Sequence, residues 1–91
     1  MDPVEIHQIE GLDYRQRMFN RNIYVYRKDR SYSAHFNYEE LSMESPYYPT
    51  PAEAIQSIVR TVQEKKFAKL RTRLNFKGKK YLTELEPWID F

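Results

Sequence analysis

The hydrophobic positions after residue 50 repeat with the period of a helix. Four β-branched residues at spacings i, i+3, i+4 and i+7 fall on one face: Ile55, Ile58, Val59 and Val62. Thr50 is suited to cap the first turn, Pro51 fits the first helical position, and Glu53 can reach back to the cap. Lys66 would fall within the apolar face. The pattern therefore predicts an amphipathic helix that begins after Thr50 and ends near Lys66.

Two segments upstream alternate with the period of a β-strand. Residues 23–26 are β-branched and aromatic, and apolar side chains recur at every second position over residues 32–38. The polar residues 27–31 between them are typical of a turn. We expect these segments to form a hairpin, followed by an acidic, proline-bounded loop over residues 39–49.

The segment after the helix also alternates. Leu70, Thr72, Leu74 and Phe76 are expected to face the helix, which turns the residues between them to the other side of the sheet. Lys77 and Gly78 form a turn signal. Residues 79–86 fit either a strand or a helical turn, and the strand is favoured because it completes a second hairpin.

The predicted fold is one small α+β domain over residues 1–91, with a β-β-α-β-β order. An antiparallel-rich sheet carries one amphipathic helix on one face. Residues 1–21 have the least clear pattern, and two alternatives stay open. Val4 and Ile6 extend the sheet, or part of this segment is disordered. One helix cannot cover both faces of such a sheet, so the other face is open to solvent or to a partner.

Positive charge is concentrated in one part of the chain. Residues 60–80 hold nine basic residues and one acid, while the whole chain carries a formal charge of only +2. Such a field attracts anionic partners. The absence of cysteine excludes a disulfide framework and fits a reducing compartment. No apolar run is long enough to span a bilayer, and the first residues do not form a secretory signal, so we expect a cytoplasmic protein.

The open face is predicted to combine Arg71 and Arg73 with Tyr24, Tyr26 and His35. Aromatic rings stack on bases while arginines hold phosphates, so single-stranded nucleic acid or another polyanion is the favoured ligand. The positive rim of this face would comprise Lys65, Lys66, Lys69, Lys77, Lys79 and Lys80. Two alternatives remain: a basic surface that is simply solvated, and a surface for a membrane or an acidic protein.

The sequence gives little support for catalysis, a metal or a cofactor. His7 and His35 are each isolated in the sequence, and no serine lies in a nucleophile motif. Three glutamates cluster between residues 39 and 44, but they lack the spacing of a calcium loop. We therefore expect a non-enzymatic binding module.

The apolar C-terminal tail is a second candidate interface. Pro87 ends the preceding segment, and Trp88 and Phe91 follow it. These side chains dock either on their own domain or on a partner. The alternative function is accordingly a protein–protein accessory or homodimeric domain that uses the open sheet face and the Trp88 tail.

Part of the chain resembles a known family in outline. Residues 22–64 look like the strand pair, loop and helix of HicB-like antitoxin domains, and residues 50–54 are similar to the Thr-x-x-Glu-Ala helix entry found there. The glycine-rich turn and the Pro-Gly loop of that family are missing. Similarity of fold alone carries no function, so none is transferred.

Overall fold

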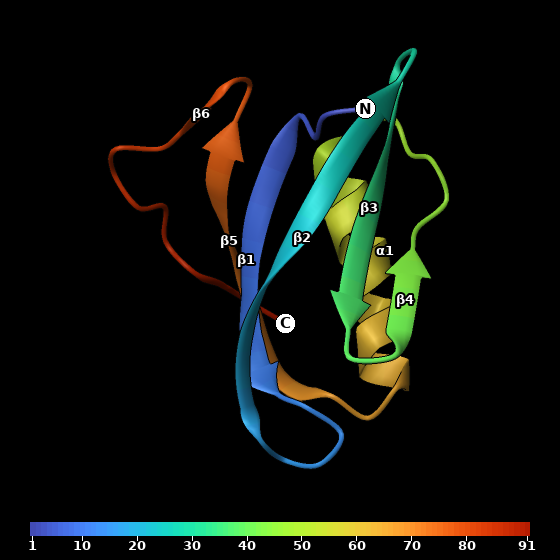
Figure 1. The fold of residues 1–91 in the computed structure, drawn as a ribbon, viewed down its shortest axis with the longest axis vertical. Helices are drawn as coiled ribbons and strands as arrows, with labels where there is room; N and C mark the ends of the chain where they lie inside the picture. The colour runs from blue at the N-terminus through green and yellow to red at the C-terminus, as the bar shows by residue number, and fades with distance from the viewer.

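The computed structural model describes residues 1–91 and has one helix packed on one face of an antiparallel sheet (Figure 1). The expected α+β class is therefore confirmed, although the sheet has seven strands rather than four. The elements are β1 (Glu5–Leu12), β2 (Met18–Lys28), β3 (Ser31–Tyr38), β4 (Leu41–Glu44), α1 (Pro51–Glu64), β5 (Ala68–Lys77), β6 (Lys80–Tyr81) and β7 (Ile89–Asp90). The strand order is β4-β3-β2-β1-β5-β6, and β7 also pairs with β5. No helix is long and apolar enough to cross a membrane.

The segment with the least clear sequence pattern supplies the middle of the sheet. β1 pairs with β2 along its whole length and with β5 on its other side. Of the two alternatives for residues 1–21, sheet formation is therefore the one that the structure has, and β2 begins at Met18 rather than at Ile23. The pattern was weak because the strand alternates only partly, with Ile6 and Ile9 as its buried side chains.

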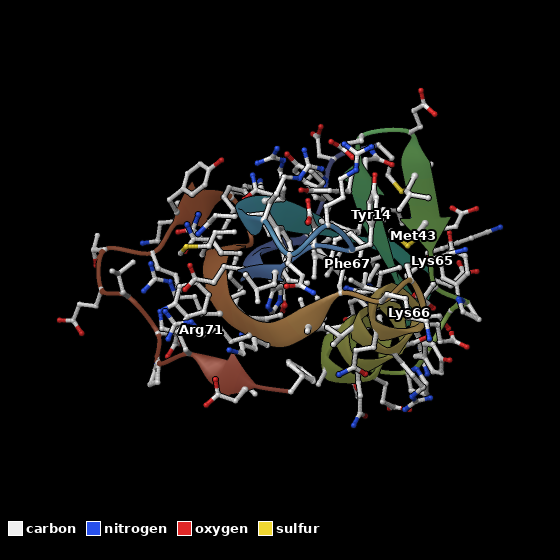
Figure 2. The ribbon with its side chains drawn as sticks, turned by 90° about the horizontal axis from the view of Figure 1, so that it is seen from below. Tyr14, Met43, Lys65, Lys66, Phe67 and Arg71 are labelled. Atoms are coloured by element: carbon white, nitrogen blue, oxygen red, sulfur yellow. The ribbon has the colours of Figure 1, made fainter.

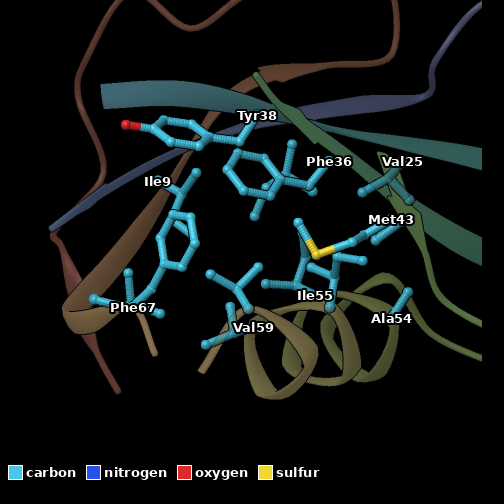
Figure 3. Packing of buried hydrophobic residues seen from close by; sticks show 14 of the residues in the cluster. Ile9, Val25, Phe36, Tyr38, Met43, Ala54, Ile55, Val59 and Phe67 are labelled. Atoms are coloured by element: carbon cyan, nitrogen blue, oxygen red, sulfur yellow. The ribbon is translucent and has the colours of Figure 1, made fainter. Parts of the chain in front are cut away.

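The helix begins and ends as predicted. The Thr50 hydroxyl accepts a hydrogen bond from the Glu53 N–H at 3.2 Å, Pro51 opens the first turn, and Lys65 forms the C-cap. The apolar face of α1 packs mainly on β3 and also contacts β2 and β4. The helical part of the core consists of Ala54, Ile55, Ile58, Val59 and Val62, which meet Val25, Phe36 and Met43 from the sheet (Figure 3).

Four aromatic rings fill the lower end of the core. Phe19 makes edge contacts with Tyr38 at 5.2 Å and with Phe67 at 5.3 Å between ring centroids, and Phe36 lies 6.3 Å from it. Edge-to-face contacts of this kind add stability beyond the buried area. They join the start of β2, the end of β3 and the segment that follows α1.

Two bulges interrupt the pairing of β1 with β5. The first lies opposite Gly11, where Lys69 has a φ of +53° and the Ala68 and Lys69 carbonyls approach closely. The second lies between the pairs His7–Leu74 and Ile6–Phe76. It shifts Phe76 to the face opposite Leu74, so the expectation that Phe76 faces the helix was wrong.

The remaining differences concern short segments. β4 occupies four residues of the expected acidic loop, with Glu39 and Glu40 as the two-residue turn before it. Only Lys80 and Tyr81 of the ambiguous 79–86 segment form a strand. The tail returns to the sheet as β7, where Ile89 pairs with Thr72 and Asp90 with Arg71.

Candidate nucleic-acid interface

The face of the sheet opposite α1 is named here the open face. Strand pairing decides which side chains share it, because directly paired residues project to the same side. One row crosses five strands through the pairs His35–Tyr24, Tyr24–Ile6, Ile6–Phe76 and Phe76–Tyr81. Four of these five residues have rings. We call this set, His35, Tyr24, Ile6, Phe76 and Tyr81, the aromatic row.

At each end of the aromatic row, a ring is held by an edge contact with a neighbouring ring. Tyr26 meets His35 edge-on at 4.8 Å between ring centroids, and Phe76 meets Tyr81 in the same way at 5.0 Å. Tyr81 remains 58% exposed, while Ile6 is buried. The row therefore presents accessible ring surface around an apolar centre.

A second row lies directly below the first. Gln8 pairs with Asn22 on one side and with Arg73 on the other, and we call these three residues the polar row. The Nε of Arg73 donates a hydrogen bond to the Gln8 side-chain oxygen at 2.7 Å. Because Gln8 is uncharged, the positive charge of Arg73 has no counter-ion.

Arg71, two residues before Arg73 on the same face of β5, differs from it in having an acidic partner. Its guanidinium forms an ion pair with Glu10, in which Nε donates to Oε1 at 2.6 Å. The charge of Arg71 is thus compensated within the protein. Of the two arginines expected to hold phosphate, Arg73 is the one whose charge is free for a ligand.

Trp88 covers both arginines. Its ring centroid lies 4.5 Å from the Arg71 guanidinium carbon and 4.2 Å from that of Arg73. These are cation–π distances. The tail thus docks its indole on its own domain, on the open face, and β7 holds it there. Phe91 lies instead in a groove of about 320 Å³ beside Ile55 and Ile89.

The predicted lysines do not gather into one patch. Lys65 and Lys66 lie at the C-terminal end of α1, on the side of the molecule away from Arg71 (Figure 2). Lys69 lies in the bulge next to Arg71. Lys77, Lys79 and Lys80 lie at the far end of β5, roughly 25 Å from Lys69 along an extended strand. The sequence block of nine basic residues is therefore divided in space.

The far end of β5 gains other cations instead. Val4 accepts a hydrogen bond from the Gly78 N–H and donates its own N–H to the Val25 carbonyl, so the β5–β6 turn and β2 lie on either side of it at the same end of the sheet. The exposed basic residues of this end are Arg27, Lys28, Arg30, Lys77, Lys79 and Lys80. We call these six residues the basic end. It borders the aromatic row.

The largest pKa shift occurs elsewhere, at Asp13 in the β1–β2 loop. Burial alone would raise the pKa of Asp13, but hydrogen bonds from the Tyr38 hydroxyl, from the Arg17 and Arg15 amides and from the Arg17 guanidinium outweigh it. Together they lower the pKa from 3.8 to about 2. Burial, followed by the bond to Asp13, raises the pKa of Tyr38. Asp13 thereby closes this loop against the core.

A neighbouring hollow of about 630 Å³ at this end has mixed charge. Tyr14, Arg15, Glu39, Glu40, Leu41 and Lys65 line it. The hydrogen bond from Tyr14, followed by that from Arg17, lowers the pKa of Glu39. Because these acids and bases neutralise one another, the hollow has no net preference for anions or cations.

The two histidines lie on opposite faces of the sheet. His7 faces the helix side, with Nε2 at 2.7 Å from Glu5, and the side chains of both residues are 15% exposed. His35 lies on the open face, 3.4 Å from the exposed Glu44. Each histidine thus has its own glutamate, and the two do not meet in one site.

Sequence reasoning missed part of the open face. It placed Tyr24, Tyr26, His35, Arg71 and Arg73 there, but not Phe76, Tyr81, Gln8 or Asn22. The alternation Asn20, Asn22, Tyr24 was the available signal that β2 begins earlier. No matching family model, curated protein or solved structure was found for this chain.

Proposed function

We propose that this protein is a non-enzymatic binding module whose open face holds single-stranded nucleic acid. The observation that carries the proposal is the aromatic row, which crosses five strands between the basic end on one side and Arg73 on the other. Rings beside uncompensated cations form the combination that binds a single strand. Bases stack on the rings, and the charges follow the backbone.

The spacing of the row suits this use. Neighbouring strands lie about 4.8 Å apart, so His35 with Tyr24 and Phe76 with Tyr81 are each within reach of successive bases that are slightly spread. Ile6 separates these two pairs of rings. Tyr24, Tyr26 and Trp88 offer stacking surfaces, and stacking tolerates any base because every base has a π-face. The strand would cross the sheet from β3 towards β6.

The phosphates are assigned to the basic end and to Arg73. No salt bridge involves any of the six residues of the basic end. Their charges therefore remain available to an anion. Lys65 and Lys66, although part of the same sequence block, lie too far away to take part.

A binding role also fits the placement of the ionisable groups. His7 and His35 are separated by the sheet, and the open face has no partner that would make His35 a general base other than the exposed Glu44. We therefore assign the open face to recognition rather than to chemistry.

The single tryptophan allows a direct test. Trp88 lies on the open face, so its fluorescence should change when a mixed-sequence single-stranded RNA or DNA binds, and the affinity should fall steeply with salt. Lys79→Ala/Lys80→Ala should lower the slope of log K against log salt by roughly 0.7 for each lost phosphate contact. Lys65→Ala/Lys66→Ala removes the same charge at the other end and should leave the slope unchanged.

Two results would refute the proposal. One is the absence of binding at low salt, and the other is an equal loss of slope in both double variants. The second result would show that only total charge matters and that the open face has no special role.

A second candidate function rests on the tail. Ile89 and Phe91 are 60% and 42% exposed, and together with Ile55 they line the groove of about 320 Å³ beside α1. Apolar side chains left in this position favour a protein partner or a second copy of the chain. Light scattering over a concentration series tests self-association, which should hardly respond to salt. Phe91→Ser should then abolish the dimer without changing nucleic-acid binding.

A further inference from the structure

The strands β2 and β3 separate on the open face. Their pairing ends at Tyr24–His35, although β2 extends back to Met18 and β3 continues to Tyr38. Figure 1 shows the two strands diverging below this point. A hollow of about 290 Å³ lies at the divergence, lined by Asn20, Arg21, Asn22, Tyr24 and Asn37. We call it the amide hollow.

The aromatic core supports the separation from the other side of the sheet. Phe19 and Phe36 follow the same alternation as Ile23 and face the helix, and their rings pack with Tyr38 where the two strands diverge. The Arg21 guanidinium carbon lies 5.3 Å from the centroid of the Tyr38 ring. The gap between the strands is therefore backed by tightly packed rings.

The amide groups in the hollow have unused hydrogen-bonding capacity. The Asn20 Nδ2 is 3.5 Å from Glu10, and the Asn22 Nδ2 is 3.4 Å from the Tyr24 hydroxyl. Both distances are at the limit for a hydrogen bond. The Asn37 side chain has no hydrogen bond within the protein, and all three asparagines are exposed. Donors and acceptors thus face the solvent side by side.

The chemistry of the hollow differs from that of the basic end. Arg21 is its only cation, and it follows the alternation of Ile23 towards the helix side, where its guanidinium lies over the Tyr38 ring. A phosphate would find little charge here. A flat neutral ring with donors and acceptors on its edge would match the amides, since an asparagine amide can give and accept one hydrogen bond to the same base.

We propose that the amide hollow receives the edge of one base of the bound strand and makes binding selective for adenine. The inference rests on the proposed function. Tyr24 belongs to both the hollow and the aromatic row, so a base in the hollow continues the line of stacked bases. An asparagine amide matches the N6 and N7 positions of adenine, to which it bonds at two points.

The test compares oligo(dA), oligo(dC) and oligo(dT) of equal length with the protein and two variants, Asn22→Ala and Asn37→Ala. The unchanged protein should bind oligo(dA) most tightly. Each variant should lose about tenfold for oligo(dA), with smaller losses for the others and an unchanged salt slope. Gln63→Ala removes an exposed amide from the helix and should change nothing.

Equal binding of the three oligonucleotides by the unchanged protein, or equal losses for all three in the variants, would overturn the inference. The proposed function would survive either result because binding itself would remain. Failure to bind any oligonucleotide at low salt would instead overturn both. Thermal unfolding of each variant serves as the folding control, and no change is expected because both asparagines are exposed.

Discussion

The indole of Trp88 lies over the guanidinium of Arg73, with the carbon of that group 4.2 Å from the ring centroid. The contact fixes the residue just before β7 to the middle of the open face. It also gives the arginine a fixed direction, because Gln8 holds its Nε from below while the ring covers its plane. A guanidinium held in this way loses less entropy when it binds a phosphate.

Removing the indole should weaken nucleic-acid binding. Trp88→Ala takes away one stacking surface, worth about 1–3 kcal/mol for one base, so we expect roughly tenfold lower affinity. The affinity is measured by the fluorescence anisotropy of a labelled oligonucleotide, because this variant has no tryptophan. Phe91→Ala truncates another aromatic residue of the same tail, on the groove side, and should leave the affinity unchanged. Equal losses of affinity in the two variants would show that the tail as a whole, and not the indole, supports binding.

Gly11 should be intolerant of any side chain. A Cβ at this position would lie 2.7 Å from the Ala68 carbonyl oxygen and 2.8 Å from that of Lys69, and neither backbone group can move without breaking the bulge. We expect Gly11→Ala to lower the free energy of unfolding by about 1–3 kcal/mol in a denaturant titration. At Gly78 a Cβ meets nothing within 4 Å, but φ is +74°, so Gly78→Ala should cost only about 1 kcal/mol. An unchanged free energy of unfolding in Gly11→Ala would show that the backbone of the bulge can shift to accept a side chain.

Acid should destabilise the protein through Asp13. Its pKa is lowered on folding from 3.8 to about 2, so the folded state favours the ionised carboxylate. The resulting stability is complete above pH 3.8 and is lost as the pH falls through about 2. Asp13→Asn should be less stable at neutral pH and should show a shallower loss between pH 4 and pH 2. Because the Glu39 carboxyl is exposed, Glu39→Gln should reduce the acid-induced loss of stability less than Asp13→Asn does.

Tyr38 should be needed to satisfy the buried Asp13. Its hydroxyl donates to Oδ2 at 2.6 Å, and the ring packs against Phe19 and Phe67. Tyr38→Phe keeps the packing but leaves the carboxylate short of one donor, which should cost about 1–3 kcal/mol of stability at neutral pH. Thermal unfolding measures the loss. In the Asp13→Asn background the same change should cost less, and full additivity would contradict the pairing.

The sequence predicts those elements whose signals are local. The cap and the apolar stripe predict the helix after Thr50. Strong alternation around a polar turn predicts the β2–β3 hairpin. Arg71, Arg73, Tyr24 and Tyr26 could be placed on one face because the period of a strand is fixed at two.

The rest depends on distant pairing. The side of Phe76 is reversed by a bulge that arises only where β1 meets β5, and no pattern within residues 70–76 signals it. The amide hollow exists because two paired strands diverge over an aromatic cluster from three elements. The basic end likewise forms only when β2 and the β5–β6 turn meet on either side of Val4.

The position of β1 in the middle of the sheet has a consequence for the order of events during synthesis. This strand is made before the other six, yet one of its two neighbours is β5, whose residues are about 60 positions later in the chain. A nascent chain that ends before β5 has one side of β1 unpaired, and its backbone groups are open to other strands. Closing such a long loop late makes folding slow. The emerging polypeptide therefore has its greatest risk of mispairing with other chains before residue 77 leaves the ribosome.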